Sequence, residues 1–354
     1  MKIAIDITPL TDMRVLGHRI RGTGFYIKNL KSSLLQYFPK NDYTFFSRGD
    51  FLNRDIDIIH YPYFEPFFLT LPFRRKYKTV VTVHDLTPFV FPEYFKIGMK
   101  GNIKWLLQKR ALKRADAIIT DSKSSKKDIV KYTGITEDRI TVVYLSAGEE
   151  FKQVENSKLK IESLKKKYNL PNKFALYVGD VTWNKNLPRF VKAVKKTNVP
   201  LVMVGKALIS YNFDRNNSWN QDLEFVQKLV NNDPQFILPG FVNQEDLVYL
   251  YNMATVFVMP SLYEGFGLPI LEAMRCGCPV VTTKEGSLAE VGGDAVLYVD
   301  AYSGDSIAEG INRVWSSASL RKELIEKGRK QAALFSWQST AKKTIEVYEK
   351  VNQK

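Results

Sequence analysis

Short apolar runs alternate along the chain with longer segments in which polar and apolar residues are mixed. The runs are rich in Val and Ile, which is typical of strands buried on both faces of a parallel sheet. The segments between them have the length and the apolar spacing of helices. This alternation predicts an α/β fold with a parallel sheet. In the first part of the chain the predicted strands are residues 3–7, 56–61, 79–83, 117–122 and 140–144.

The same alternation starts again after residues 151–170, a lysine-rich helical segment that is poor in aromatic residues. The chain therefore predicts two Rossmann-like domains and a final helix. The domains cover residues 1–166 and 167–335, and the helix covers residues 336–354. The predicted strands of the second domain are residues 174–178, 201–205, 236–238, 254–259 and 280–281.

The composition agrees with two soluble domains. A chain of 354 residues, 45% of them hydrophobic, is long enough to build two cores. Its first residues predict a strand rather than a signal peptide, and no apolar run approaches the ~20 residues of a membrane span. Cys276 and Cys278 flank one glycine and are too close for an ordinary disulfide. We therefore expect a cytoplasmic protein with free thiols.

The charge of the chain is strongly positive. A formal net charge of +15 implies a phosphate-bearing partner, such as a nucleotide, a lipid diphosphate, an anionic membrane or a nucleic acid. Residues 96–114 hold seven basic residues and no acidic one, interleaved with apolar residues. They predict a basic amphipathic helix suited to peripheral contact with the inner face of an anionic membrane. No nucleic-acid-binding motif accompanies the charge, so we expect no nucleic-acid partner.

A short Asp-x-Asp motif is typical of a metal site, but its position at the start of a strand does not favour one here. Asp55 and Asp57 form an Asp-x-Asp pattern, which holds a metal in GT-A glycosyltransferases. Here the pattern leads directly into a predicted strand, so we expect a solvated strand entrance and no metal site.

The most informative stretch is residues 254–283. An apolar strand is followed by a polar turn, two glycines and a short helix that ends before Gly277. Glycines at a helix start leave backbone N–H groups accessible, where the helix dipole also favours an anion. Glu264 precedes the glycines. The helix is predicted at residues 270–274 after Pro269, with Glu272 in its first turn. A carboxylate can accept hydrogen bonds from both hydroxyls of a diol, so this corner suits a nucleotide sugar.

The spacing of Glu264 and Glu272, with Gly-Phe-Gly-Leu-Pro between them, closely resembles the E-x7-E signature of retaining glycosyltransferases of family 4. The resemblance covers nearly the whole chain. It implies the GT-B fold, in which two Rossmann-like domains face each other across a cleft and a C-terminal helix crosses back onto the first. It also implies transfer of a sugar from a nucleotide donor with retained configuration, without a cofactor or a metal.

The resemblance assigns roles to residues in both domains. Gly22 and Gly24 would form a glycine-rich loop that faces the donor diphosphate, directly before a helix predicted at about residues 25–37. Glu272 would hold the ribose, while Lys185 and the amides of the glycine loop would stabilise the diphosphate. Glu264 would orient the donor sugar, and His84 would contact the sugar or the acceptor. We name Glu264, His84 and Lys185 as catalytic candidates. The predicted donor-binding residues are Gly22, Gly24, Lys185, Lys206, Val242, Glu264, Gly265, Phe266, Gly267, Leu268 and Glu272.

At one position the chain departs from the family pattern. Asp180 stands where an arginine usually follows the glycine, so the diphosphate lacks one of two cations. Arg189 or Lys206 are the candidates to replace it. The departure also raises a non-catalytic nucleotide-sugar-binding subunit as an alternative.

The donor and the acceptor are specified less closely. From the resemblance and the basic first domain we predict a hexosyltransferase that moves mannose from GDP-mannose to a saccharide or lipid-linked saccharide in cell-surface polysaccharide synthesis. A transferase of the same fold that uses a UDP-sugar is the main alternative. An epimerase or a phosphorylase would share the fold as well.

Overall fold

The computed structural model of the 354-residue chain describes residues 1–11, 20–52, 55–155, 158–210, 212–214 and 220–353. The chain divides into two compact units. The first unit consists of residues 1–92, 96–146 and 335–354, and the second of residues 93–95 and 147–334. Residues 147–166, which the sequence placed with the first domain, therefore lie in the second unit.

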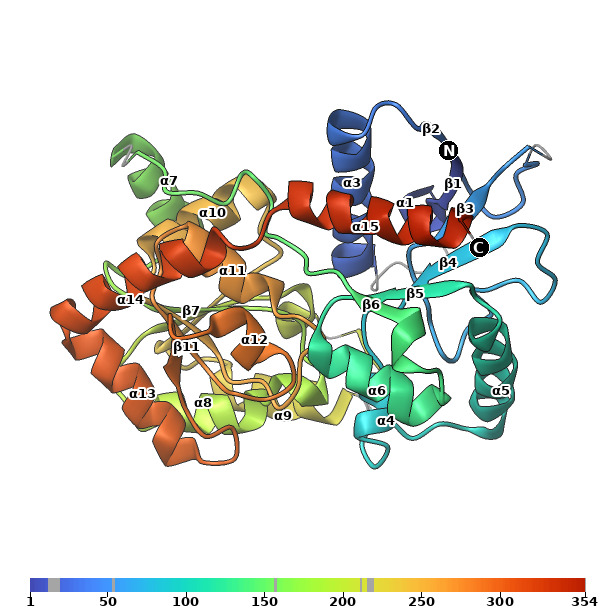
Figure 1. The fold of residues 1–354 in the computed structure, drawn as a ribbon. Coiled ribbons are helices and arrows are strands. Elements are labelled where there is room, and N and C mark those ends of the chain that lie inside the picture. Colours follow the sequence, from blue (N-terminus) through green and yellow to red (C-terminus); the bar gives the residue numbers. More distant parts are fainter. Residues whose placement is uncertain (12–19, 53–54, 156–157, 211, 215–219, 354) are drawn as a thin grey trace. The chain divides into compact units, whose positions relative to one another are not determined.

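The first unit is built on a parallel sheet of six strands in the order β2-β1-β3-β4-β5-β6 (Figure 1). The central strands are buried almost throughout, as expected for a parallel sheet covered by helices on both faces. The strands are β1 (Lys2–Asp6), β2 (Asp42–Phe46), β3 (Ile58–Tyr61), β4 (Lys78–Thr82), β5 (Ala117–Thr120) and β6 (Ile140–Val142).

Helices cover both faces of this sheet. Figure 1 shows α3 and α15 on one face, and α5 and α6 on the other. The final helix α15 packs on α3 and on β3, β4 and β5, which confirms the predicted return of the C-terminal helix to the first domain. The helices are α1 (Thr8–Thr11), α3 (Ile20–Tyr37), α4 (Thr87–Val90), α5 (Met99–Lys113), α6 (Lys123–Thr133) and α15 (Trp337–Asn352), with a 3-10 turn at Glu137–Arg139.

A buried hydrogen-bond chain joins α15 to the sheet and to α3. The Tyr348 hydroxyl lies 2.7 Å from His60 Nδ1, and His60 Nε2 lies 2.8 Å from Thr82 Oγ1. Thr82 Oγ1 in turn lies 3.2 Å from the hydroxyl of Tyr26 on α3. Burial lowers the pKa of His60 to about 3, so the ring is neutral and serves as a structural link.

The two aspartates of the Asp-x-Asp pattern contact the start of β1. Asp57 Oδ2 accepts a hydrogen bond of 2.8 Å from the backbone N–H of Lys2, and Asp55 pairs with the Lys2 ammonium. The strand that follows begins at Ile58. These contacts agree with the solvated strand entrance that we expected.

The second unit is built on another parallel sheet of six strands, in the order β12-β11-β10-β7-β8-β9. Counted from its own first strand, this is the 3-2-1-4-5-6 order of the doubly wound dinucleotide-binding fold. The strands are β7 (Ala175–Val178), β8 (Leu201–Val204), β9 (Phe236–Gly240), β10 (Val256–Met259), β11 (Val280–Thr282) and β12 (Leu297–Tyr298).

Helices α8 and α13 of the second unit bury apolar faces in the core that covers this sheet. Phe190, Val191 and Val194 of α8, for example, share one core with Val258 of β10 and Ile307 of α13. The helices are α7 (Lys158–Tyr168), α8 (Leu187–Lys195), α9 (Gln221–Val230), α10 (Gln244–Met253), α11 (Leu268–Arg275), α12 (Leu288–Gly292), α13 (Gly304–Ser316) and α14 (Ala318–Ala332), with 3-10 turns η2 (Trp183–Lys185) and η3 (Lys206–Ile209).

The strand order decides where a ligand would bind. In open α/β sheets, ligands occupy the carboxyl ends of the strands at the point where the strand order reverses. In this unit that point lies between β7 and β10, which pair directly. The loop after β7 and the glycine loop after β10 are therefore neighbours, although 79 residues separate Lys185 from Glu264.

Among the described residues, no helix combines the length and the hydropathy needed to cross a bilayer.

Candidate functional site

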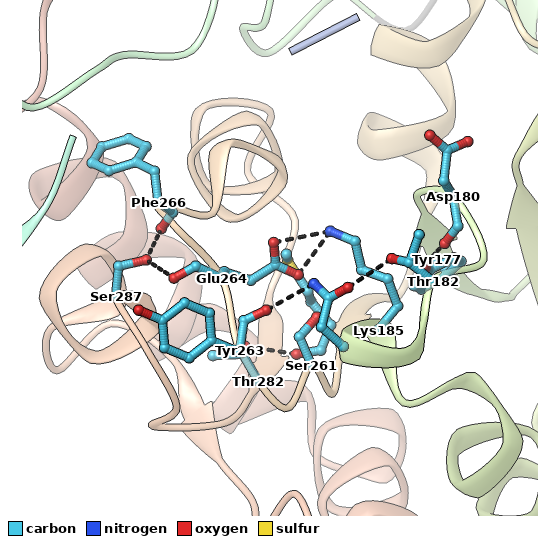
Figure 2. A network of polar contacts seen from close by, with 12 residues as sticks. Tyr177, Asp180, Thr182, Lys185, Ser261, Tyr263, Glu264, Phe266, Thr282 and Ser287 are labelled. Carbon is cyan, nitrogen blue, oxygen red and sulfur yellow. Dashed lines mark hydrogen bonds and ion pairs between the residues drawn. The ribbon is translucent and has the colours of Figure 1, made fainter. Parts of the chain in front are cut away.

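An ion pair between Lys185 and Glu264 lies at the switch point of the second unit. The Lys185 ammonium donates to both carboxylate oxygens of Glu264, at 2.8 and 2.9 Å (Figure 2). The two side chains are only 19% and 11% exposed. Two residues that the sequence named as catalytic candidates are thus brought into direct contact.

Hydrogen bonds between the two loops hold this pair in register. Asn184 Nδ2 donates to the carbonyl of Tyr263 at 3.0 Å, and the N–H of Leu262 donates to the carbonyl of Asn184 at 2.7 Å. Asn186 directly precedes α8 and adopts a left-handed conformation with a φ of 59°. Its amide group donates to the carbonyls of Pro260 and Ala301. Lys185 is therefore fixed on both sides by asparagines that bind the β10 loop.

The glycine loop itself is shaped by Gly267 and Ser287. Gly267 has a φ of 103° and directly precedes α11, which begins at Leu268, two residues earlier than predicted. Ser287 Oγ lies 2.9 Å from the carbonyl of Glu264 and 2.7 Å from that of Phe266 (Figure 2). With these carbonyls engaged, the loop leads into the N-terminus of α11, whose dipole favours an anion.

The glycine loop also packs closely on Gly286. A Cβ atom at Gly286 would lie 2.6 Å from the carbonyl oxygen and 2.8 Å from the nitrogen of Glu264, and the φ of 61° is unfavourable for alanine. Gly286→Ala is expected to displace Glu264 and to lower the rate of sugar transfer about a hundredfold. Strain of this kind costs about 1–3 kcal/mol of unfolding free energy.

A second glycine provides the control for this variant. Gly304→Ala adds a Cβ whose nearest neighbour lies 3.9 Å away, at the start of α13, so rate and stability should stay close to wild type. Steady-state rates and thermal unfolding of both variants test the prediction. Equal rates in the wild type and in Gly286→Ala would show that the position of Glu264 is unimportant.

Glu272 lies in the second turn of α11, rather than in the first turn as the sequence suggested. The Tyr251 hydroxyl, from α10, donates to Glu272 Oε2 at 2.8 Å. Burial raises the pKa of Glu272 to about 7; the hydrogen bond from Tyr251 acts against this rise, and the charge of Glu150 adds to it. Tyr251 was not predicted from the sequence, because a tyrosine among the apolar residues of a helix indicates only core packing.

Lys206 and Val242 lie near the carboxyl ends of β8 and β9. Lys206 is exposed and begins the 3-10 turn after β8, while the Val242 side chain is buried, so only its backbone could meet a ligand. The turns after β7 and β8 approach closely, since a Cβ on Gly205 would lie within 2.4 Å of the carbonyl of Gly179. Lys206 is thus placed at the same edge of the sheet as the Lys185 loop.

Asp180 stands in place of the usual arginine, and Arg189 is a candidate to replace that arginine. Both residues make contacts outside the Lys185–Glu264 pair. Figure 2 shows the carboxyl group of Asp180 turned away from Lys185 and Glu264, while its carbonyl accepts from the Tyr177 hydroxyl at 2.9 Å. Arg189 donates to Asn186 Oδ1 and to the carbonyl of Ala301. Arg189 therefore supports the Lys185 loop, which leaves Lys206 as the remaining candidate for the second cation.

The remaining candidates belong to the first unit. The sequence placed Gly22 and Gly24 in a loop before a helix that begins near residue 25, but both lie inside α3, which begins at Ile20. The segment of residues 12–19 before it lies outside the described residues. At Gly22 and Gly24 the structure therefore has the first part of a helix where the sequence predicted a glycine-rich loop. A Cβ atom added at Gly22 would have no neighbouring atom within 4 Å.

His84 follows β4 and forms a pair with Asp121, which follows β5. His84 Nδ1 lies 2.6 Å from Asp121 Oδ2, and the Tyr26 ring makes a T-shaped contact with the imidazole. Burial acts to lower the pKa of His84, but the carboxylate of Asp121 outweighs it and holds that pKa above its usual value. Nε2 is buried without a hydrogen-bond partner in the described part of the chain. Asp121 was missed, although its place directly after an apolar strand is a recognisable signal.

Comparison with known proteins agrees with this architecture. The sequence model of Glycosyl transferases group 1 matches residues 160–331, and that of Glycosyltransferase Family 4 matches residues 14–146. Serotype-specific mannosyltransferase WbdA of Escherichia coli is 34% identical over 282 residues, which are 78% of this chain and 34% of that protein. The chain thus spans about a third of the length of this relative.

Two further proteins match over more of their own length. O-antigen chain mannosyltransferase B of Escherichia coli is 33% identical over 303 residues, which are 82% of this chain and 75% of that protein. The solved structure of HepE from Anabaena, in complex with UDP and glucose, has a TM-score of 0.73 at 16% identity and covers 99% of this chain and 100% of its own. The fold is GT-B, and the chain belongs to family 4 of the glycosyltransferases.

Proposed function

We propose that this glycosyltransferase moves mannose from GDP-mannose to a hydroxyl of a saccharide or lipid-linked saccharide acceptor, with retained configuration, in cell-surface polysaccharide synthesis. The Lys185–Glu264 ion pair beside the N-terminus of α11 is the observation that carries the proposal. It places one cation and one carboxylate at the point of the sheet where a nucleotide ligand is expected. The names of the two Escherichia coli relatives, both mannosyltransferases, support mannose as the sugar.

In this proposal each donor group meets a residue of matching chemistry. The diphosphate accepts hydrogen bonds from the Lys185 ammonium and from the amides of Gly265 to Leu268. The ribose hydroxyls donate to the carboxylate of Glu272, and Glu264 accepts hydrogen bonds from hydroxyls of the sugar. The base would contact the backbone near Val242, because that side chain is buried.

The chemical step breaks the bond between the anomeric carbon and the diphosphate oxygen. Negative charge then develops on the leaving GDP, where the fixed ammonium of Lys185 and the helix dipole stabilise it. The acceptor oxygen bonds to the anomeric carbon, and its proton leaves with the phosphate. These groups supply the positive charge that a metal would otherwise provide, so we propose a reaction without a metal or other cofactor. His84 contributes through the hydrogen-bonded pair that it forms with Asp121.

Donor binding has to rearrange the ion pair. In the structure, Lys185 donates to both oxygens of Glu264, so a diphosphate must take over part of this interaction. Glu264 is then free to accept hydrogen bonds from the sugar. Because the exchange needs both the diphosphate and the sugar, free GDP should bind less tightly than GDP-mannose.

A UDP-sugar donor is the second candidate. The structural similarity to HepE, whose solved complex contains UDP and glucose, favours it. Recognition of the base through the backbone would allow either base. A non-catalytic nucleotide-sugar-binding subunit is a third candidate, because Asp180 replaces the usual arginine.

A donor screen distinguishes these candidates. The protein is heated with GDP-mannose, UDP-glucose or ADP-glucose, and turnover of each donor is followed with and without saccharide acceptors. A donor present at a hundred times its Kd stabilises the folded state by about 2.7 kcal/mol, which raises Tm by several degrees. We expect GDP-mannose to give the largest shift and to be turned over. A larger shift and turnover with UDP-glucose would favour the second candidate, and binding without turnover would favour the third.

A further inference from the structure

Helix α5 of the first unit exposes apolar residues that the fold leaves uncovered. Ile103, Leu106 and Leu107 are 58%, 65% and 40% exposed, and Met99 at the start of the helix is 85% exposed. Counted from Met99 they occupy positions i, i+4, i+7 and i+8, and therefore share one face of the helix. The residues that α5 buries are Gln108, Ala111 and Leu112. A surface helix normally buries its larger apolar residues and exposes polar ones, so this outer face is unusual.

A second segment adds to the same surface. Residues 67–73 run alongside α5, and Phe68, Leu69 and Phe73 are 37%, 42% and 48% exposed. The ring of Phe68 lies 5.5 Å from the Lys104 ammonium of α5. At the far end of the segment, Arg114 donates to the carbonyl of Phe73. We call the exposed apolar residues of α5 and of residues 67–73 the α5 surface.

Gln108 holds the two segments together. Its buried Oε1 accepts hydrogen bonds from the N–H groups of Thr70 and Leu71, at 3.0 and 2.9 Å, and from the Thr70 hydroxyl at 3.0 Å. Its Nε2 donates back to the carbonyl of Leu71 at 3.3 Å. A fully buried glutamine that fixes a loop on a helix keeps the exposed aromatic residues of the loop in a constant place beside α5.

The two stretches of sequence that form the α5 surface carry positive charge only. The chain has no acidic residue between Pro66 and His84 or between Tyr94 and Ala115. Exposed cations lie on α5 and directly after residues 67–73: Lys100, Arg110 and Lys113 on the helix, and Arg74 and Lys76 after the loop. Lys109, which the sequence counted with them, instead donates to the carbonyl of Tyr132 and is tied to the end of α6.

We propose that the α5 surface docks on a lipid bilayer rich in anionic headgroups. The apolar residues of α5 and of residues 67–73 would enter the boundary between headgroups and acyl chains, while the surrounding lysines and arginines meet the lipid phosphates. The positive charge beside these apolar residues favours an anionic bilayer over a second copy of this chain, because a second copy would bring an equally positive surface against it. The proposal is independent of the donor sugar and of the acceptor.

Vesicle flotation tests the proposal with a matched pair of variants. Leu106→Glu places a charge in the centre of the α5 surface. Leu159→Glu makes the same change at a leucine that is 86% exposed on α7, a helix that is also rich in lysine. Binding to phosphatidylglycerol vesicles should fall on the order of tenfold or more in Leu106→Glu, and less than about twofold in Leu159→Glu.

The aromatic loop and the charge are tested in the same way. Phe73→Ser should weaken binding to phosphatidylglycerol vesicles, whereas Phe51→Ser, at a side chain 91% exposed elsewhere in the first unit, should not. Wild-type binding should decrease with added salt and be weak on phosphatidylcholine vesicles. All four side chains are exposed, so thermal unfolding should stay near wild type.

Three results would overturn the proposal. The first is equal binding of the wild type and Leu106→Glu to phosphatidylglycerol, and the second is no binding by either. The third is a dimer, seen by sedimentation of the wild type, that Leu106→Glu dissociates. That result would assign the α5 surface to contact between two copies. Turnover of a soluble donor by Leu106→Glu should match wild type, which separates failure of docking from failure of the proposed catalysis.

Discussion

Replacing Lys185 with alanine is expected to lower the rate of sugar transfer by about a hundredfold to a thousandfold. Removal of a single group that stabilises developing charge typically has an effect of this size. The change also leaves the carboxylate of Glu264, which is only 11% exposed, without its partner. A shielded unpaired charge destabilises a fold, so we expect a loss of unfolding free energy of about 1–3 kcal/mol.

A double variant separates these two effects. In Lys185→Ala/Glu264→Gln the unpaired charge is gone, so thermal stability should recover in part while transfer stays low. Lys196→Ala serves as the control, because it removes a lysine from an exposed pair with Asp305 in the same unit. Such surface pairs contribute little, so its rate and Tm should be unchanged. Near wild-type transfer in Lys185→Ala, measured with the fold intact, would exclude Lys185 from the reaction.

Replacing Glu272 with alanine is the second change with a large expected effect. In the proposed function the Glu272 carboxylate accepts two hydrogen bonds from ribose hydroxyls, and bonds to charged groups contribute about 1.5–3 kcal/mol each. Transfer at low donor concentration should fall at least a hundredfold, mainly through weaker donor binding. The fold should stay intact in circular dichroism, because no ion pair is broken.

The raised pKa of Glu272 adds a pH signature to this variant. The carboxylate, which is the form that accepts from both hydroxyls, predominates only above a pH of about 7. Donor binding should therefore weaken as the pH falls through 7. The Tyr251 hydroxyl stabilises the charged form, so Tyr251→Phe should move this midpoint to higher pH. Glu309→Gln, at an exposed position on α13, should leave the profile unchanged.

The raised pKa of Glu272 also makes the unfolding free energy decrease as the pH rises. The folded state holds the proton of Glu272 more tightly than the unfolded state, whose pKa is near 4.5. Stability from this group is therefore fully present below about 4.5 and is lost as the pH rises toward 7. In Glu272→Gln this loss should be absent, so its Tm should exceed that of wild type at pH 8. A pH-independent difference between the two proteins would contradict the assignment.

The local pattern of residues was sufficient to predict most of the fold and part of the site. Apolar runs marked the described strands except β2 and β12, which the sequence did not predict. The glycines and Pro269 marked the start of α11 to within two residues. The E-x7-E spacing identified both carboxylates. Periodicity succeeds here because it records which side chains are buried, and burial is a local property of each strand or helix. Where a glycine stands within a helix, as at Gly22, the same pattern misplaced the helix start.

Contacts between distant segments had to come from the tertiary structure. The pairing of Lys185 with Glu264 depends on β7 lying beside β10, which follows from the crossover of the chain and from no local pattern. The partners of His84 and Glu272, namely Asp121 and Tyr251, likewise come from other strands and helices. The outer face of α5 was also undecided, because its apolar residues surround the helix and only packing shows which remain exposed. The residues alone determined the chemical groups available; the order of the strands and the packing of the helices determined which of them meet.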